Sequence, residues 1–360
     1  MTEQAGAGAA GLLISQAWEA CGQGRYGTAR AAAARAVQAA KQLDGPVLLV
    51  RALAAEASAL EMLGDKATAL ARYTQILGLA EDPATRGRLD DPDAAWAVAH
   101  AHMHWVESAR SAGGVPVRAL FGVLDAGDDY LRAIGRPQWR AGLLLQRGLT
   151  HQRLGEWDEA VAFAEEALAL YQDDAPGYTH AAHRWQLGDI LRGAGRPGEA
   201  EPYYQAILDE PDTADNPADR KVALKGLARC ALVRGDLAAA RRHALAAVRE
   251  AEPLGDDSLF DALSTVVAVH QAAGDLDAAA VAAGRLLESA RRLGGHYNLY
   301  FAVRDVVDVA LDRGDLGQAR ELLTELGEHA DALAAVDATT GWAAELAKRR
   351  ERLSRAESTP

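Results

Sequence analysis

The sequence predicts an all-α protein made of about eight helical hairpins in a row, and two observations support this fold. A glycine followed five residues later by an alanine occurs eight times, at Gly24/Ala29, Gly64/Ala69, Gly114/Ala119, Gly155/Ala160, Gly195/Ala200, Gly235/Ala240, Gly274/Ala279 and Gly314/Ala319. Successive glycines are 40, 50, 41, 40, 40, 39 and 40 residues apart. A fixed spacing of this length is typical of stacked repeats rather than of separate globular domains.

Residues 148–174 illustrate one repeat. Gly155 interrupts a first helical pattern, and Ala160 opens a second. Glycine can end a helix in the left-handed conformation because it has no Cβ atom to clash. We expect Asp158 to cap the N–H groups at the start of the second helix.

The helix pairs follow in chain order. They are expected at 11–22 with 28–43, within 47–79 on either side of Gly64, at 94–111 with 117–134, at 138–153 with 158–171, at 178–194 with 198–209, and in three further pairs that turn at Gly235, Gly274 and Gly314. Residues 1–10 are expected to be a flexible N-terminus, 11–336 the repeat array, and 337–360 a capping helix and tail.

Two segments depart from the regular pattern. Residues 81–93 form an insertion with two prolines and five acids, which either contacts a ligand or is a tolerated excursion. The last helix, expected at 341–355 with Thr340 as its cap, carries five basic residues in its C-terminal half. Such a polar helix suits the open end of a solenoid, and a nucleic-acid-binding arm is the alternative interpretation.

Composition excludes several classes of partner. The formal net charge of −13 argues against a nucleic-acid or anionic-membrane surface, since both require a basic face. No apolar run is long enough for a membrane span, and no basic segment precedes the short apolar stretch near the start. Cys21 and Cys230 are expected to be reduced residues of the core. Together these features predict a cytoplasmic protein.

The repeats resemble those of the tetratricopeptide repeat family. A small residue is expected seven positions before the turn glycine, and Ala17, Ala57, Gly148, Gly188 and Ala228 comply. An apolar residue is expected eleven positions before it, and all repeats comply except at Arg184. This resemblance implies a right-handed superhelical solenoid. The period near 40 residues is that of a long form, since the short form repeats every 34.

Enzyme motifs are absent from the sequence. There is no Gly-rich phosphate loop, no His-Glu-x-x-His, no Gly-x-Ser-x-Gly and no paired Cys-x-x-Cys, so we predict no catalytic residue and no cofactor. His100 and His104, one helical turn apart, could chelate a metal. No acid or cysteine at matching spacing completes a site, although Glu107 lies three residues beyond His104. We therefore expect a packed or solvated helix face and no metal.

A binding groove is the main functional prediction. The resemblance implies that the first helix of each hairpin lines the concave side, and it assigns the inward positions. The predicted ligand-binding residues are Trp105, Arg153, Trp185, Arg192, Lys225 and Arg229. Tryptophan and arginine are favoured anchors at interfaces, so we expect a ligand with an acidic group and an apolar portion. Alternatively, the two tryptophans fill gaps between repeats and the cations pair with Asp189 and neighbouring acids.

These features predict a non-enzymatic scaffold or sensor that binds a peptide, a protein segment or a small ligand in its concave groove. A ligand- or peptide-responsive regulatory subunit that acts on a transcription regulator, with the DNA-binding part on another chain, is one alternative. An enzyme that uses the solenoid as a pocket is another. One fold of this kind serves many partners, so the fold alone does not select among them.

Overall fold

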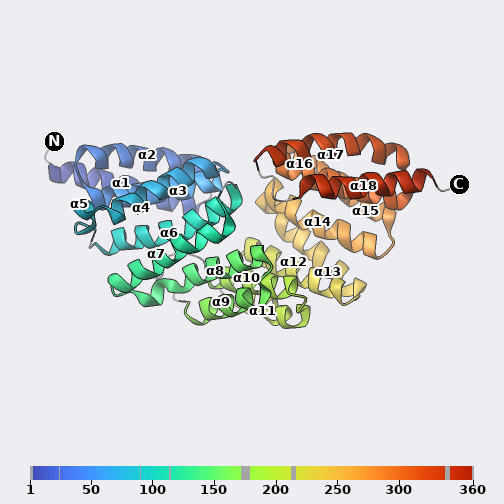
Figure 1. The fold of residues 1–360 in the computed structure, drawn as a ribbon, viewed down its shortest axis with the longest axis horizontal. Helices are drawn as coiled ribbons and strands as arrows, with labels where there is room; N and C mark the ends of the chain where they lie inside the picture. The colour runs from blue at the N-terminus through green and yellow to red at the C-terminus, as the bar shows by residue number, and fades with distance from the viewer. Residues whose placement is uncertain are drawn as a thin grey trace. The chain divides into compact units, whose positions relative to one another are not determined.

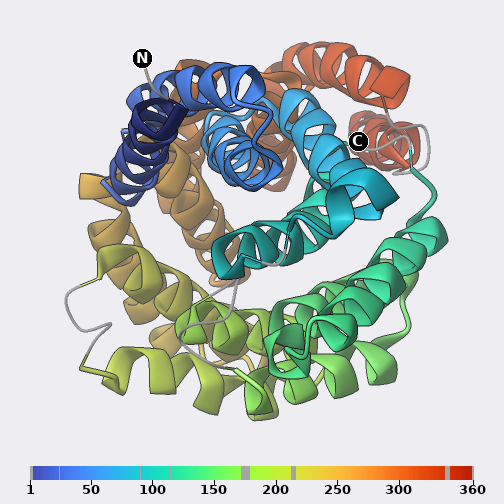
Figure 2. The ribbon, with the colours of Figure 1, turned by 90° about the vertical axis from the view of Figure 1, so that its left-hand side faces the viewer.

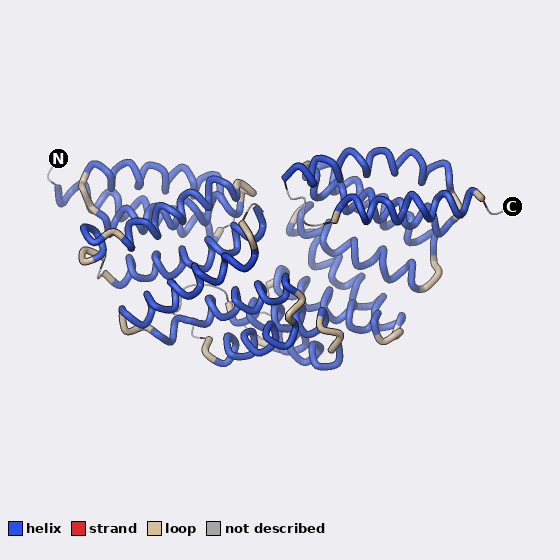
Figure 3. The backbone as a smooth tube through the Cα atoms, viewed as in Figure 1, coloured by secondary structure: helices blue, strands red, loops and turns tan. Residues whose placement is uncertain are grey.

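In a computed structural model, residues 3–23, 25–89, 91–112, 115–171, 179–211, 216–336 and 341–358 are described. Every regular element in these ranges is helical, and they contain no strand (Figure 3). The chain divides into two compact units, residues 1–183 and 184–360, with the division inside one helix. The all-α prediction is therefore confirmed.

The first unit begins with five helices and continues with helix pairs, one of which turns at Gly155 (Figure 1). Its elements are α1 (Glu3–Gly22), α2 (Tyr26–Gln42), α3 (Pro46–Met62), α4 (Lys66–Glu81), α5 (Pro83–Arg86), α6 (Pro92–Ala112), η1 (Val117–Ala119), α7 (Leu120–Ala133), η2 (Pro137–Arg140), α8 (Ala141–Leu154) and α9 (Trp157–Ala169). Helices α1, α2 and α3 pack together near the N-terminus (Figure 2).

The second unit takes up most of α10 and all that follows. Its elements are α10 (His180–Gly193), α11 (Pro197–Asp209), α12 (Pro217–Val233), α13 (Leu237–Ala251), η3 (Glu252–Leu254), α14 (Asp256–Ala272), α15 (Leu276–Leu293), α16 (His296–Arg313), α17 (Leu316–Val336) and α18 (Trp342–Glu357). From α12 onward, each helix packs most closely against its neighbours along the chain, as consecutive hairpins require.

The predicted turns have the expected conformation. Six of the eight turn glycines are described, and all six have φ between +70° and +81°, whereas Gly24 and Gly114 lie outside the described residues. The alanine five positions later has no exposed surface in seven repeats. The exception is Ala119, which is exposed in η1, while the next residue, Leu120, is fully buried. The 3₁₀ turn after Pro116 shifts this repeat by one residue.

Close approach of the two helices is confirmed in the fourth hairpin. A Cβ atom on Gly148 would lie 2.9 Å from the carbonyl oxygen of Ala160. In the fifth hairpin the nearest atoms to a Cβ on Gly188 belong to the ring of Tyr204, at 2.7 Å. The larger side chain fills the space between the helices there.

Helix capping follows the Gly-Asp turns. Asp65, Asp236 and Asp275 each accept a hydrogen bond from the backbone N–H three residues later. The expected cap at Asp158 is wrong, because α9 already begins at Trp157. Glu156 takes the position after the glycine, and its longer side chain pairs with His151 and Arg118 instead of capping the helix.

The N-terminus also differs from expectation. Residues from Glu3 onward are helical, so α1 starts within the segment predicted to be flexible. Packing explains this start: Ala10 has no exposed surface, and Gly6 lies so close to Leu43 that an added Cβ would be 3.1 Å from its side chain. Small residues here allow the first turns of α1 to lie against the end of α2.

The insertion at 81–93 is short and partly ordered by packing. Asp82 caps α5 through the N–H of Ala84, and Leu89 is buried. Arg88 donates a hydrogen bond of 2.6 Å to the carbonyl oxygen of Asp44 in the linker between α2 and α3. These contacts give the insertion a structural role in the first unit.

The C-terminal helix α18 covers the last hairpin. Arg349 pairs with Asp308 of α16 at 2.7 Å, and Arg352 pairs with Asp308 and Asp312, each at 2.8 Å. Lys348 pairs with Glu345 on α18 itself. Thr340, the expected cap, lies outside the described residues. Several cations of the basic run are thus neutralised within the chain, which favours the capping role over a nucleic-acid-binding arm.

Candidate functional site

The six predicted ligand-binding residues fall into both units. Trp105 and Arg153 belong to the first unit, and Trp185, Arg192, Lys225 and Arg229 belong to the second.

Trp105 is half-buried between helices. Its indole N–H donates a 2.9 Å hydrogen bond to the hydroxyl of Thr74 on α4, and its ring packs on apolar residues of both neighbouring repeats. These contacts support the alternative that this tryptophan fills a gap between repeats. Arg153 is exposed near the end of α8 and makes no ion pair with any described residue.

The second unit brings the remaining cations together on α10 and α12. Lys221, Lys225 and Arg229 follow one another at intervals of four residues, which places them on one face of α12. Trp185 and Arg192, seven residues apart, share one face of α10 in the same way. Lys221 did not stand out in the sequence, although its four-residue spacing from Lys225 was a usable signal.

Asp261 on α14 is the acid opposite the α12 cations. It lies 2.6 Å from the Nζ of Lys225 and 3.5 Å from that of Lys221. Burial alone would raise the pKa of Asp261. The two lysines and Arg229 outweigh this effect and hold the pKa below its usual value. Burial lowers the pKa of Lys225, against the opposing effect of Asp261. Asp261 therefore remains ionised and shared among several cations.

Asp189 on α10 is the second acid of the group. Its Oδ1 lies 3.2 Å from the guanidinium of Arg192 and accepts a 2.8 Å hydrogen bond from the hydroxyl of Tyr204. Arg192, Lys221 and Lys225 pair with these two carboxylates, and Arg229 lies near enough to influence the pKa of Asp261, so four cations and two acids give a local formal charge of +2 in a chain with a net charge of −13. We call these six residues the basic cluster.

The three histidines of residues 99–105, which include His100 and His104, belong to the first unit. His104 Nδ1 lies 3.0 Å from the carboxylate of Glu61, and His100 Nε2 lies 2.9 Å from the hydroxyl of Ser58. Burial acts to lower the pKa of His104, but the carboxylate of Glu61 outweighs it and raises this pKa above its usual value. For His100, burial lowers the pKa well below its usual value. The described residues contain no group of three or more metal-ligating side chains placed to hold an ion.

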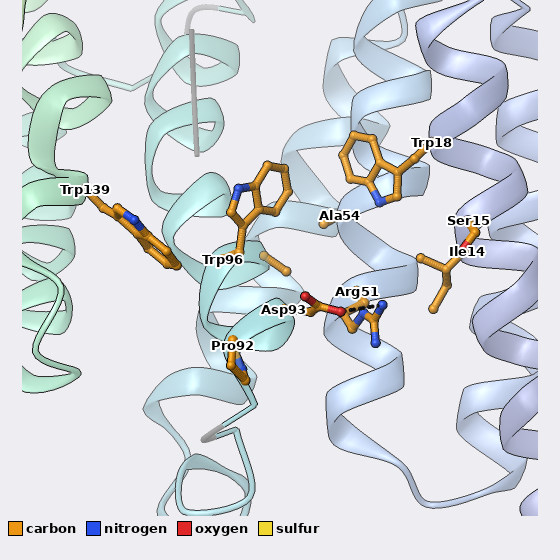
Figure 4. A pocket seen from close by; sticks show the side chains of 10 residues that line it. Ile14, Ser15, Trp18, Arg51, Ala54, Pro92, Asp93, Trp96 and Trp139 are labelled. Atoms are coloured by element: carbon orange, nitrogen blue, oxygen red, sulfur yellow. Dashed lines mark ion pairs between the residues drawn. The ribbon is translucent and has the colours of Figure 1, made fainter. Parts of the chain in front are cut away.

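A cavity of about 510 Å³ opens in the first unit, and the sequence did not predict it. Its walls include the indoles of Trp18 from α1, Trp96 from α6 and Trp139 from η2 (Figure 4). An ion pair of 2.7 Å between Arg51 on α3 and Asp93 on α6 lies beside them. The available signal was the concentration of tryptophans in this half of the chain. We call this site the tryptophan cavity.

Aromatic side chains in contact with one another line the walls of the tryptophan cavity. Trp18 and Trp96 meet edge to face, with ring centroids 5.5 Å apart and planes at 89°. His100 stacks on Trp96 at 4.9 Å. Trp139 is 5% exposed, and among the described residues its buried indole N–H has no acceptor. An apolar cavity of this size with a few polar groups has the usual make-up of a small-molecule site.

No helix among the described residues is long and apolar enough to cross a membrane. A comparison with curated proteins finds no match in sequence.

Three solved structures resemble this fold along nearly their whole length. The apo form of RapI is 10% identical, with a TM-score of 0.60 and 97% of each chain covered. A Rap protein complexed with Competence and Sporulation Factor is 13% identical, with a TM-score of 0.57, covering 96% of this chain and 99% of that one. The apo form of the quorum sensor NprR from B. thuringiensis is 13% identical, with a TM-score of 0.57, covering 97% of this chain and 100% of that one.

The tetratricopeptide repeat family also matches the sequence directly, over residues 139–209. These residues include the hairpin of α8 and α9, where Gly148 and Ala160 make the expected close contact. The same glycine-to-alanine spacing runs through the hairpins on both sides of this segment. Tetratricopeptide repeats are thus identified over residues 139–209, within an all-helical chain.

Proposed function

We propose that this protein is a non-enzymatic binding protein that captures an acidic peptide or protein segment at the basic cluster of its second unit. The local charge of the cluster is the observation that supports this proposal. Lys221 and Lys225 share the carboxylate of Asp261, which is 36% exposed, and Arg229 lies close enough to help lower its pKa, so the cations here outnumber the acids that an incoming carboxylate would join. Nearby charges decide the approach of a ligand, because charges farther away than about 8 Å are screened at physiological salt.

Trp185 supplies the apolar part of the proposed site. It is half-buried on the α10 face that also carries Arg192, so its ring can pack on a ligand side chain while the arginine meets an acid. Aromatic and arginine side chains of this kind are the usual anchors of interfaces. Asp189 holds Arg192 at 3.2 Å, which fixes the direction of the guanidinium before a ligand arrives.

A ligand-responsive regulatory role is the second candidate. Similar structures include a quorum sensor and a Rap protein in complex with a factor, which favours a sensor over a passive scaffold. In this second candidate function, the bound ligand changes the affinity of the protein for a transcription regulator carried on another chain. Co-purification of such a regulator, lost on addition of the ligand, would distinguish the two candidates.

The test is a pull-down with defined charge reversals. Wild type is compared with the double variant Arg192→Glu/Arg229→Glu, and with a control double variant, Arg241→Glu/Arg242→Glu, on the exposed side of α13. Mass spectrometry identifies the retained proteins, and circular dichroism verifies that all three are folded. We expect wild type and control to retain a partner that the first variant loses. Equal retention by all three would show that the basic cluster is only structural.

A further inference from the structure

We propose that the tryptophan cavity is a second binding site, for a small aromatic molecule that carries an anionic group. This inference does not rest on the proposed function, because the tryptophan cavity belongs to the first unit and shares no residue with the basic cluster.

The aromatic part of the ligand follows from the walls. Three indoles border a space of about 510 Å³, within the range of cavities that enclose small ligands. Trp18 and Trp96 stand at 89° to each other, so a planar ring that stacks on one indole meets the edge of the other. Both arrangements are favourable for aromatic rings. His100 stacks on Trp96, with ring centroids 4.9 Å apart, and helps to hold this wall in place.

The anionic part follows from the ion pair beside the tryptophans. Arg51 and Asp93 are 27% and 64% exposed, so Asp93 is the partner that solvent can take up at little cost. Asp93 also lies in the first turn of α6, where the helix dipole stabilises its negative charge without Arg51. An incoming carboxylate can therefore replace Asp93 on the guanidinium of Arg51. A cation would have to displace Arg51 from Asp93, and Arg51 is held in place by its greater burial.

The experiment uses three probes of one shape and different charge: 2-naphthoate, neutral 2-naphthamide and the cation 2-naphthylmethylammonium. Binding to the full-length protein is measured by isothermal titration calorimetry. We expect 2-naphthoate to bind about tenfold or more tightly than the amide, as a charge-assisted hydrogen bond implies, and the cation to bind most weakly. No binding of 2-naphthoate, equal affinity for the three probes, or preference for the cation would overturn the proposal.

Variants locate the site. Arg51→Met should reduce the affinity for 2-naphthoate to the level of the affinity for the amide. Asp93→Asn should increase the affinity for 2-naphthoate, because the carboxylate that competes for Arg51 is lost. Arg118→Met removes a matched 2.7 Å ion pair, with Glu156, that lies outside the cavity, and it should change nothing. Ser15 is an exposed residue of the cavity lining, so Ser15→Trp should block all three probes without disturbing the core. An Arg51→Met variant that is folded by circular dichroism and binds 2-naphthoate as wild type does would contradict the assignment.

Discussion

Gly226 of α12 lies against the ring of Tyr204 of α11, so closely that a Cβ atom on the glycine would be 2.3 Å from the ring. Gly188 of α10 approaches the same ring, at 2.7 Å. Tyr204 is fully buried, and its hydroxyl donates to Asp189, so the ring cannot move aside without losing that hydrogen bond. Three helices meet at this one side chain, next to the basic cluster.

Gly226→Ala should therefore destabilise the second unit by about 1–3 kcal/mol, the usual cost of overpacking a core. Gly284→Ala is the matched control, since Gly284 is exposed on α15 and an added Cβ meets nothing within 4 Å. We expect it to be neutral or to stabilise the helix by about 0.5–1 kcal/mol. Urea denaturation followed by circular dichroism measures both changes, and equal midpoints for the two variants would refute the contact.

Stability should depend on pH through His102. Burial lowers the pKa of His102 to about 4 from its ordinary value of 6.5. Between these values the unfolded chain binds more protons than the folded protein, so the free energy of unfolding falls as the pH falls from about 6.5 to 4. At pH 5, the fall in the free energy of unfolding should be about 2 kcal/mol smaller for His102→Gln than for wild type.

The measurement compares wild type and His102→Gln by urea denaturation at pH 5 and pH 7.5. The difference between the two proteins is needed because His104, whose pKa is raised by Glu61 despite its burial, acts in the opposite direction. The stabilisation that protonated His104 contributes is complete at low pH and is lost as the pH rises. An identical pH dependence in wild type and variant would rule out His102 as a cause.

Docking of the capping helix should depend on Asp308. This carboxylate accepts from Arg349 and Arg352, and it is 19% exposed. Asp308→Asn should cost about 1.5–3 kcal/mol, the usual contribution of hydrogen bonds to charged groups, and should speed amide hydrogen exchange throughout α18. Asp277→Asn breaks a pair in which the acid is 90% exposed, and it should cost less than about 1 kcal/mol. Unchanged exchange in α18 would disprove this docking role.

The two tryptophans of the predicted groove should behave differently. Trp105→Phe keeps a ring between α4 and α6 but loses the hydrogen bond to Thr74, so it should cost about 1 kcal/mol of stability and leave partner capture unchanged. Trp185→Ala should weaken capture by about 2 kcal/mol if this ring anchors the ligand. The pull-down of the proposed function, repeated with both variants, measures the difference. Loss of partner capture with Trp105→Phe would show that Trp105 belongs to the binding site after all.

The sequence alone determined most of the helices and their turns, and it indicated the resemblance to tetratricopeptide repeats that residues 139–209 match. These features depend on local rules: a glycine ends a helix near every fortieth residue, and an alanine or glycine permits the next helix to approach, as at Gly148 and Ala160. At η1, where a 3₁₀ turn precedes the helix, the glycine-to-alanine rule was wrong by one residue, because Leu120 rather than Ala119 is buried.

Only the tertiary structure decided which side chains meet across repeats. Lys225 and Asp261 are 36 residues apart in the chain, and the basic character of their cluster depends on how many cations share that one acid. The tryptophan cavity joins residues as distant as Trp18 and Trp139, so its existence depends on the stacking of successive hairpins. The repeat period specifies that hairpins stack, whereas the side chains at each interface determine whether the space between them is filled or left open as a cavity.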